Sequence, residues 1–152
     1  MDETPLRVFI DTNVWVSAFI NADGAPARIL EAFLAGRFVP VVSRVLLEEI
    51  DGVLRRPRIR RRLRLIEADL ATILALLRDR AVEAVPEGNL RLCRDPDDNL
   101  LLETAVLGEA RFAVSRDDDI KRDLDLMARL KEQGVEVVSV AHFLSLLAGP
   151  AA

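Results

Sequence analysis

The sequence predicts an α/β fold in which a mostly parallel sheet is covered by helices on both faces. Short, β-branched apolar runs alternate along the chain with longer segments of helical periodicity. The first run, residues 8–10, is continuously apolar, as in a strand buried on both faces. Carboxylates lie just past the ends of two such runs, at Asp11 and Asp117. In open α/β sheets, ligands bind beyond the carboxyl ends of the strands, so these positions are candidate site residues.

Length and composition indicate one globular domain over residues 1–152. With 152 residues, 51% of them hydrophobic, the chain can bury a substantial core. No apolar run is long enough to span a bilayer, so we expect no membrane segment. The single cysteine, Cys93, excludes an intrachain disulfide and fits a reducing cytoplasm. The net charge of −4 means that nucleic-acid binding would need a local basic patch.

The first half of the chain is expected to contain two helices, a strand and a third helix. Helical patterns cover residues 12–22 and 26–37, and residues 38–42 form the strand, in which Pro40 favours an edge position or a strand end. Ser43 is a good N-cap for a helix over residues 44–56. On that helix Glu49 lies at the flank of the apolar stripe, whereas Glu48 points to solvent.

A basic stretch over residues 55–64 links this helix to a longer one, residues 67–80. Pro57 breaks the first helix, and the two helices form an arm at about 44–81 beside the sheet. The arginines suit contacts to phosphate or to an acidic protein partner, and the alternative is a solvated, arginine-rich face. The candidate RNA-binding residues are Arg58, Arg60, Arg61 and Arg116.

The second half returns to the strand–helix alternation. A weak strand or extended link is expected at residues 84–86, strands at 111–115 and 135–140, and helices from residue 96, at 124–133 and at 141–148. Asp95 can cap the helix that begins at Pro96. Asp98 shares a face of that helix with the core-facing leucines, so its side chain should look toward the sheet.

Four carboxylates can therefore reach one edge of the sheet: Asp11, Glu49, Asp98 and Asp117. Two carboxylates about 4 Å apart repel by roughly 4 kcal/mol at an effective dielectric constant of about 20. A divalent cation removes this cost, and ligation by oxygen alone selects a hard metal such as Mg²⁺ or Mn²⁺. Such a site can bind a phosphodiester and activate water against it, which indicates metal-dependent phosphoryl chemistry. The simpler interpretation of Asp11 is a helix cap.

Four short motifs resemble those of the PIN-domain nucleases, in particular the group known as toxin components of toxin–antitoxin pairs. They are Asp11-Thr12-Asn13, Ser43 followed by Glu49-Ile50, Asp95-Pro96-Asp97-Asp98-Asn99, and Ser115-Arg116-Asp117. Each motif is weak alone, but together they occur in the right order on the right elements. The resemblance extends over about residues 8–147.

The resemblance implies a three-layer α/β/α sandwich and a Mg²⁺- or Mn²⁺-dependent endoribonuclease acting on single-stranded RNA. It also implies a homodimer and inhibition by a cognate antitoxin protein. By position, Asp11 and Asp98 would be primary metal ligands, and Glu49 would be a ligand or orient water. Asp117 would complete the site or hold a second metal, with Asp119 as a further acid.

Supporting polar roles would fall to Asn13, Ser43 and Ser115. Arg116 departs from the family pattern, since many members have Gly there. Two other functions stay open. An Asp-based phosphatase would need a second Asp two residues after Asp11, where this chain has Asn13. A catalytically silent module that binds RNA or protein is the other alternative, and the intact acids argue against it.

Overall fold

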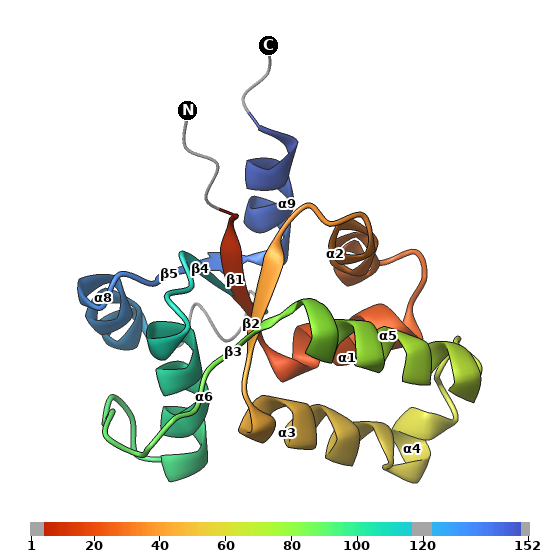
Figure 1. Cartoon of the computed structure of the whole chain (residues 1–152), viewed down its shortest axis with the longest axis horizontal. Coiled ribbons are helices and arrows are strands. Elements are labelled where there is room, and N and C mark those ends of the chain that lie inside the picture. Colours follow the sequence, from red (N-terminus) through yellow and green to blue (C-terminus); the bar gives the residue numbers. More distant parts are fainter. Residues whose placement is uncertain (1–4, 117–122, 150–152) are drawn as a thin grey trace.

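The computed structural model describes residues 5–116 and 123–149, which form a five-stranded sheet with flanking helices (Figure 1). The strand order is β3-β2-β1-β4-β5, and every adjacent pair of these strands is parallel. The expected α/β/α arrangement with a parallel central sheet is therefore confirmed. The strands are β1 (Arg7–Ile10), β2 (Val39–Val42), β3 (Val82–Glu83), β4 (Phe112–Ser115) and β5 (Glu136–Ser139).

Helices cover both faces of the sheet (Figure 1). Helices α6 and α8 lie on one face, and α1, α2, α5 and α9 lie on the other. Helix α3 packs between α1 and α6 at the carboxyl ends of the strands. The helices are α1 (Thr12–Ile20), α2 (Ala25–Leu34), α3 (Arg44–Leu54), α4 (Pro57–Arg60), α5 (Glu67–Arg80), α6 (Pro96–Leu107), α8 (Leu124–Glu132) and α9 (Val140–Ala148).

The order of the strands creates a switch point between β1 and β4. The chain leaves β1 through α1 on one face of the sheet and leaves β4 toward α8 on the opposite face. Asp11 follows β1 at this point, and its backbone N–H donates to the Val114 carbonyl oxygen at 3.0 Å. Ligands of open α/β sheets bind in the crevice that such a reversal leaves at the carboxyl ends. The fold thus puts Asp11 where a ligand is expected.

The core continues on the α9 side of the sheet as a chain of aromatic side chains. The Phe112 and Phe38 rings each contact the Phe143 ring of α9. Trp15 of α1 is 1% exposed and packs against Phe19 and Phe33. Trp15 is therefore a core residue and is not available to stack on a base.

Pro40 was expected at a sheet edge or at a strand end. It is the second residue of β2, next to the start of the strand, and β2 is not an edge strand because it lies between β1 and β3. Proline is tolerated there since β3 is only two residues long and pairs with Val41 and Val42, leaving the β3 side of Pro40 unpaired. The weak strand expected at 84–86 is this β3, two residues earlier in the chain, with Ala84 N–H donating to the Val42 carbonyl at 2.8 Å.

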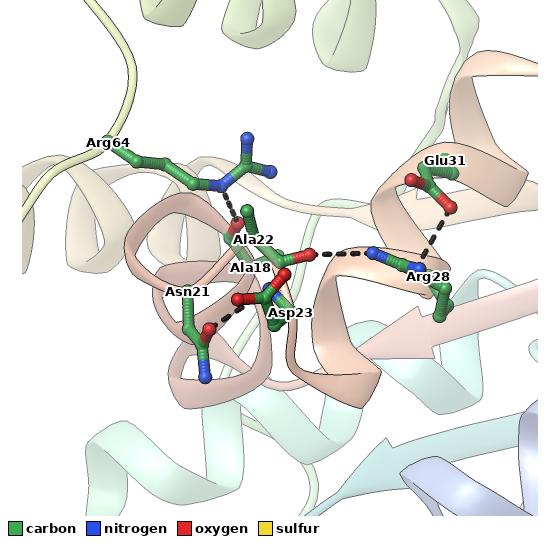
Figure 2. A network of polar contacts seen from close by, with 7 residues as sticks. All are labelled: Ala18, Asn21, Ala22, Asp23, Arg28, Glu31 and Arg64. Atoms are coloured by element: carbon green, nitrogen blue, oxygen red, sulfur yellow. Dashed lines mark hydrogen bonds and ion pairs between the residues drawn. The ribbon is translucent and has the colours of Figure 1, made fainter.

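The expected helical arm corresponds to α3, α4 and α5, and its linker is tied to the end of α1. Arg64 follows α4, and its backbone N–H donates to the Phe19 carbonyl oxygen at 3.2 Å. The Arg64 Nε–H donates to the Ala18 carbonyl oxygen, also at 3.2 Å (Figure 2). Two carbonyls that α1 leaves without helical partners are thereby satisfied. Beside them, the Arg28 guanidinium spans from the Ala22 carbonyl to the Glu31 carboxylate (Figure 2).

Candidate metal centre

A cavity of about 430 Å³ lies between α6, α8 and the sheet and extends to the carboxyl ends of β1 and β4. Its floor is apolar and includes Phe9, Ala113 and Val137 on neighbouring strands. Its polar lining residues are Asp11, Asn13, Glu49, Cys93, Asp98, Ser115 and Asp123. Three acids that are far apart in the sequence, Asp11, Glu49 and Asp98, thus reach one cavity from β1, α3 and α6.

Asp11 is both the N-cap of α1 and a lining residue of the cavity. One carboxylate oxygen, Oδ1, accepts a hydrogen bond from the Thr12 backbone N–H at 2.8 Å. The helix begins here because extended backbone at Asp11 turns directly into helical backbone at Thr12. The capping interpretation is correct, and it is compatible with a ligand role because a carboxylate has about four lone-pair sites, of which the cap uses one.

Glu49 reaches the cavity from the flank of α3. Burial raises the pKa of the Glu49 carboxyl, and the negative charges of Asp98 and Asp97 raise it further. The Thr12 hydroxyl and the Arg56 charge act in the opposite direction and lower this pKa. The effect of the Asp98 and Asp97 charges on this pKa indicates that Glu49 belongs to a cluster of acids. Its neighbour Glu48 faces away and pairs with Arg44 at 2.8 Å, as the sequence predicts.

Asp98 lies in the first turn of α6, on the side that faces the cavity. The turn is set by Asp95, whose Oδ1 accepts from the Asp97 N–H at 2.9 Å, and by Pro96 at the first helical position. Burial raises the pKa of Asp98, and the charges of Asp95 and Asp97 add to the effect. Asp97 does not line the cavity, yet its charge acts on both Glu49 and Asp98.

Two buried polar residues of α6, Asn99 and Glu103, were not assigned a role from the sequence. The Asn99 side chain accepts hydrogen bonds from the N–H groups of Leu92 and Cys93 at 3.0 and 2.9 Å, and donates to the Cys93 carbonyl. One turn later, Glu103 is 4% exposed and accepts from the Gly88 N–H at 2.9 Å. These residues fasten the loop before α6, which carries Cys93 into the cavity. The sequence signal that could have revealed these two residues is their spacing of four, which places both polar side chains on one face of the helix.

The three supporting residues occupy different environments. Asn13 and Ser115 line the cavity. Ser43 is fully buried, where its Oγ accepts from the Leu46 N–H and shares a 2.8 Å hydrogen bond with Thr104 Oγ1. Ser43 therefore caps α3 and joins it to α6, and in this structure its hydroxyl contacts no carboxylate among the residues described.

None of the four arginines proposed for RNA binding is among the described residues that line this cavity. Arg60 is 3.5 Å from the Glu67 carboxylate, and Arg61 donates to the Pro57 carbonyl within its own turn. Arg58 and Arg116 are exposed, and neither forms an ion pair with another described residue. Two of the predicted acids, Asp117 and Asp119, lie outside the residues that the structure describes.

The donor set fits a hard divalent cation that keeps some of its water. Over residues 5–116 and 123–149, no three Asp, Glu, His or Cys side chains come together as a ready metal cage. Mg²⁺ does not require such a cage, because it is commonly held by one or two carboxylates together with waters and substrate phosphates. The buried Thr12 hydroxyl is a further polar group beside the acids. It makes no hydrogen bond of standard geometry, but it is close enough to the Glu49 carboxyl to lower the pKa of that group. The cavity can therefore accept a hydrated cation.

Comparison with known proteins gives two matches. Residues 7–119 match the family model described as PIN domain. An uncharacterized protein of Methanocaldococcus jannaschii is 32% identical over 120 residues, which cover 79% of this chain and 76% of that protein. The family match includes Asp11, Glu49 and Asp98 and the segment that contains Asp117. Within the described residues, no helix is long and apolar enough to cross a membrane.

Proposed function

Because this chain belongs to the PIN domain family, whose members are generally nucleases that use divalent metal ions, we propose that it is a metal-dependent endoribonuclease. Its substrate is single-stranded RNA, and its reaction is hydrolysis of a phosphodiester bond. The observation that carries the proposal is the meeting of Asp11, Glu49 and Asp98 in one cavity at the switch point of the sheet.

We assign different roles to the acids according to their environments. Asp11 and Asp98 would hold Mg²⁺ or Mn²⁺, with Asp117 completing the site. When bound, the metal neutralises charge on the scissile phosphate and makes water a better nucleophile. The raised pKa of Glu49 makes its carboxylate a stronger base than an ordinary glutamate, so it is suited to take the proton of the attacking water.

The cellular role follows from the family group that the motifs resemble. We propose that the chain is the toxin of a toxin–antitoxin pair in the cytoplasm, that it forms a homodimer, and that a cognate antitoxin protein inhibits it. The net negative charge supports a substrate interaction that is local and not spread over the whole surface, with Arg58, Arg60, Arg61 and Arg116 as its candidate residues.

The test is cleavage of a labelled single-stranded RNA by the purified chain. We expect cleavage with Mn²⁺, loss of cleavage when a chelator is added, and a fall of at least about 100-fold for Asp11→Asn, which removes a metal-binding charge. Asp125→Asn is the matched control, because Asp125 is exposed on α8 and pairs with Arg129. Absence of metal-dependent cleavage by the wild type, or equal rates for wild type and Asp11→Asn, would overturn the proposal. Binding of RNA without cleavage would favour the silent-module alternative.

A further inference from the structure

Helix α3 divides its charged residues between two faces. On one face they form ion pairs one turn apart: Arg44 with Glu48 at 2.8 Å, and Asp51 with Arg55 at 2.9 Å. All four border the surface depression between α3 and α5. Each positive charge on this face is therefore already neutralised by a neighbour on the same helix.

Glu49 lies on the opposite face of α3, and Arg56 stands two residues past the end of this helix, as the N-cap of α4. Seven residues at about 100° each return to within about 20° of the starting direction, so the two side chains project the same way. The direction holds approximately beyond Leu54, because Arg55 keeps helical dihedral angles (φ −82°, ψ −14°) and the Arg56 N–H donates to the Val53 carbonyl at 3.1 Å. Since Glu49 lines the acidic cavity, Arg56 lies on the same side, just past the end of α3.

Among the described residues, Arg56 is the basic residue whose charge acts on Glu49. Its side chain is exposed and makes neither an ion pair nor a hydrogen bond with any residue in the described part of the chain. Its charge nevertheless lowers the pKa of Glu49. By contrast, Arg55 is engaged with Asp51, and Arg60 lies near Glu67.

We propose that Arg56 binds an RNA phosphate adjacent to the one that is cleaved, and so guides the strand along α3 into the acidic cavity. The inference rests on the proposed ribonuclease function. A cavity lined by carboxylates repels the substrate backbone, and an unengaged guanidinium at its approach supplies the missing attraction. Arginine suits the task because its planar fork can donate two parallel hydrogen bonds to one phosphate.

The first experiment measures binding of a fluorescent single-stranded RNA by the full chain in chelator, where no cleavage occurs, across a range of salt concentrations. We expect Arg56→Gln to weaken binding about tenfold at low salt, to a similar extent for different RNA sequences. The slope of log affinity against log salt should fall in magnitude by about 0.7, the value for one phosphate contact on a single strand. Arg56→Lys should restore most of the slope, because it keeps the charge.

Arg55→Gln is the matched control, since it changes the net charge equally one residue away but removes an arginine that is paired with Asp51. It should bind RNA as the wild type does. With Mn²⁺, Arg56→Gln should raise KM by a larger factor than it lowers kcat. Both variants should unfold at the wild-type temperature, because both side chains are exposed.

Two results would overturn the inference in different ways. If the wild type cleaves RNA but Arg56→Gln and Arg55→Gln share the same KM and salt slope, Arg56 has no role in binding and the nuclease function stands. If the wild type neither binds nor cleaves RNA, the proposed function fails and the role of Arg56 fails with it.

Discussion

At the scale of single residues, the acids of the cavity lower the folding stability of the metal-free protein at neutral pH. Glu49 and Asp98 have raised pKa values because they are partly buried beside other acids. A carboxyl with a raised pKa binds its proton more tightly in the folded than in the unfolded chain, so folding stability falls as pH rises through the interval between the two pKa values. At neutral pH, the metal-free protein therefore carries unfavourable charge that a cation would relieve.

The raised pKa of Glu49 gives a prediction for Glu49→Gln in metal-free protein. At pH 7 the variant should melt above the wild type by no more than about 2 °C, because Glu49 is exposed and solvent screens its repulsion by the neighbouring acids. The difference should vanish below pH 4.5, the ordinary pKa of Glu, where the wild-type carboxyl is also neutral. The measurement is thermal unfolding by circular dichroism in chelator across this pH range. Glu48→Gln, which alters an exposed pair with Arg44, should show no such rise. A gain for Glu49→Gln that is equal at all pH values would contradict the assignment.

At the scale of elements, helix α1 connects the site to the arm. Its first residue follows Asp11, and its last carbonyls receive hydrogen bonds from Arg64 (Figure 2). Cations near a helix C-terminus also interact favourably with the helix dipole. One short helix is therefore held at one end by the acidic cavity and at the other by the linker between α4 and α5.

Arg64→Ala should consequently lower the free energy of unfolding by about 1 kcal/mol, since it removes a hydrogen bond and a favourable charge at the end of α1. The backbone hydrogen bond to Phe19 remains, which limits the loss. Urea unfolding measures the change. Arg62→Ala is the control, because the Arg62 side chain is exposed and has no hydrogen bond or ion pair with a described residue. Equal losses for the two variants would show that Arg64 does not anchor the arm.

Elements with strong local signals were predicted well from the sequence. The bounds expected for α5, residues 67–80, agree with the structure, because its periodicity lies between clear breaks. Helix α3 ends two residues earlier than expected, at Leu54, because the chain turns into α4 before Pro57. The two-residue β3 was displaced since its place is set by pairing with β2, which no local pattern encodes.

At the scale of the whole molecule, the sheet topology makes the site. Asp11, Glu49 and Asp98 could be selected from the sequence because each follows a strand or shares a face with core residues. Their arrival in one cavity depends on the order of the strands and the placement of α3, which are tertiary properties. The same holds for Asn99, whose contacts to residues 92 and 93 cannot be read from its own segment. Arg56 was not among the arginines predicted to bind RNA, because the sequence does not show which arginines form ion pairs in the folded chain.

The most direct test of the central claim, that these acids form one divalent-metal site, is a calorimetric titration of the purified chain with Mn²⁺ at pH 7. We compare the wild type with Asp11→Asn, Glu49→Gln and Asp98→Asn, and use Asp125→Asn as the control. Wild type and control should bind Mn²⁺ with equal affinity. Asp11→Asn and Asp98→Asn should each weaken binding by about tenfold or more, and Glu49→Gln should weaken it less, because Glu49 is proposed to act on the attacking water. Mn²⁺ binding that all three cavity substitutions leave unchanged would contradict the claim.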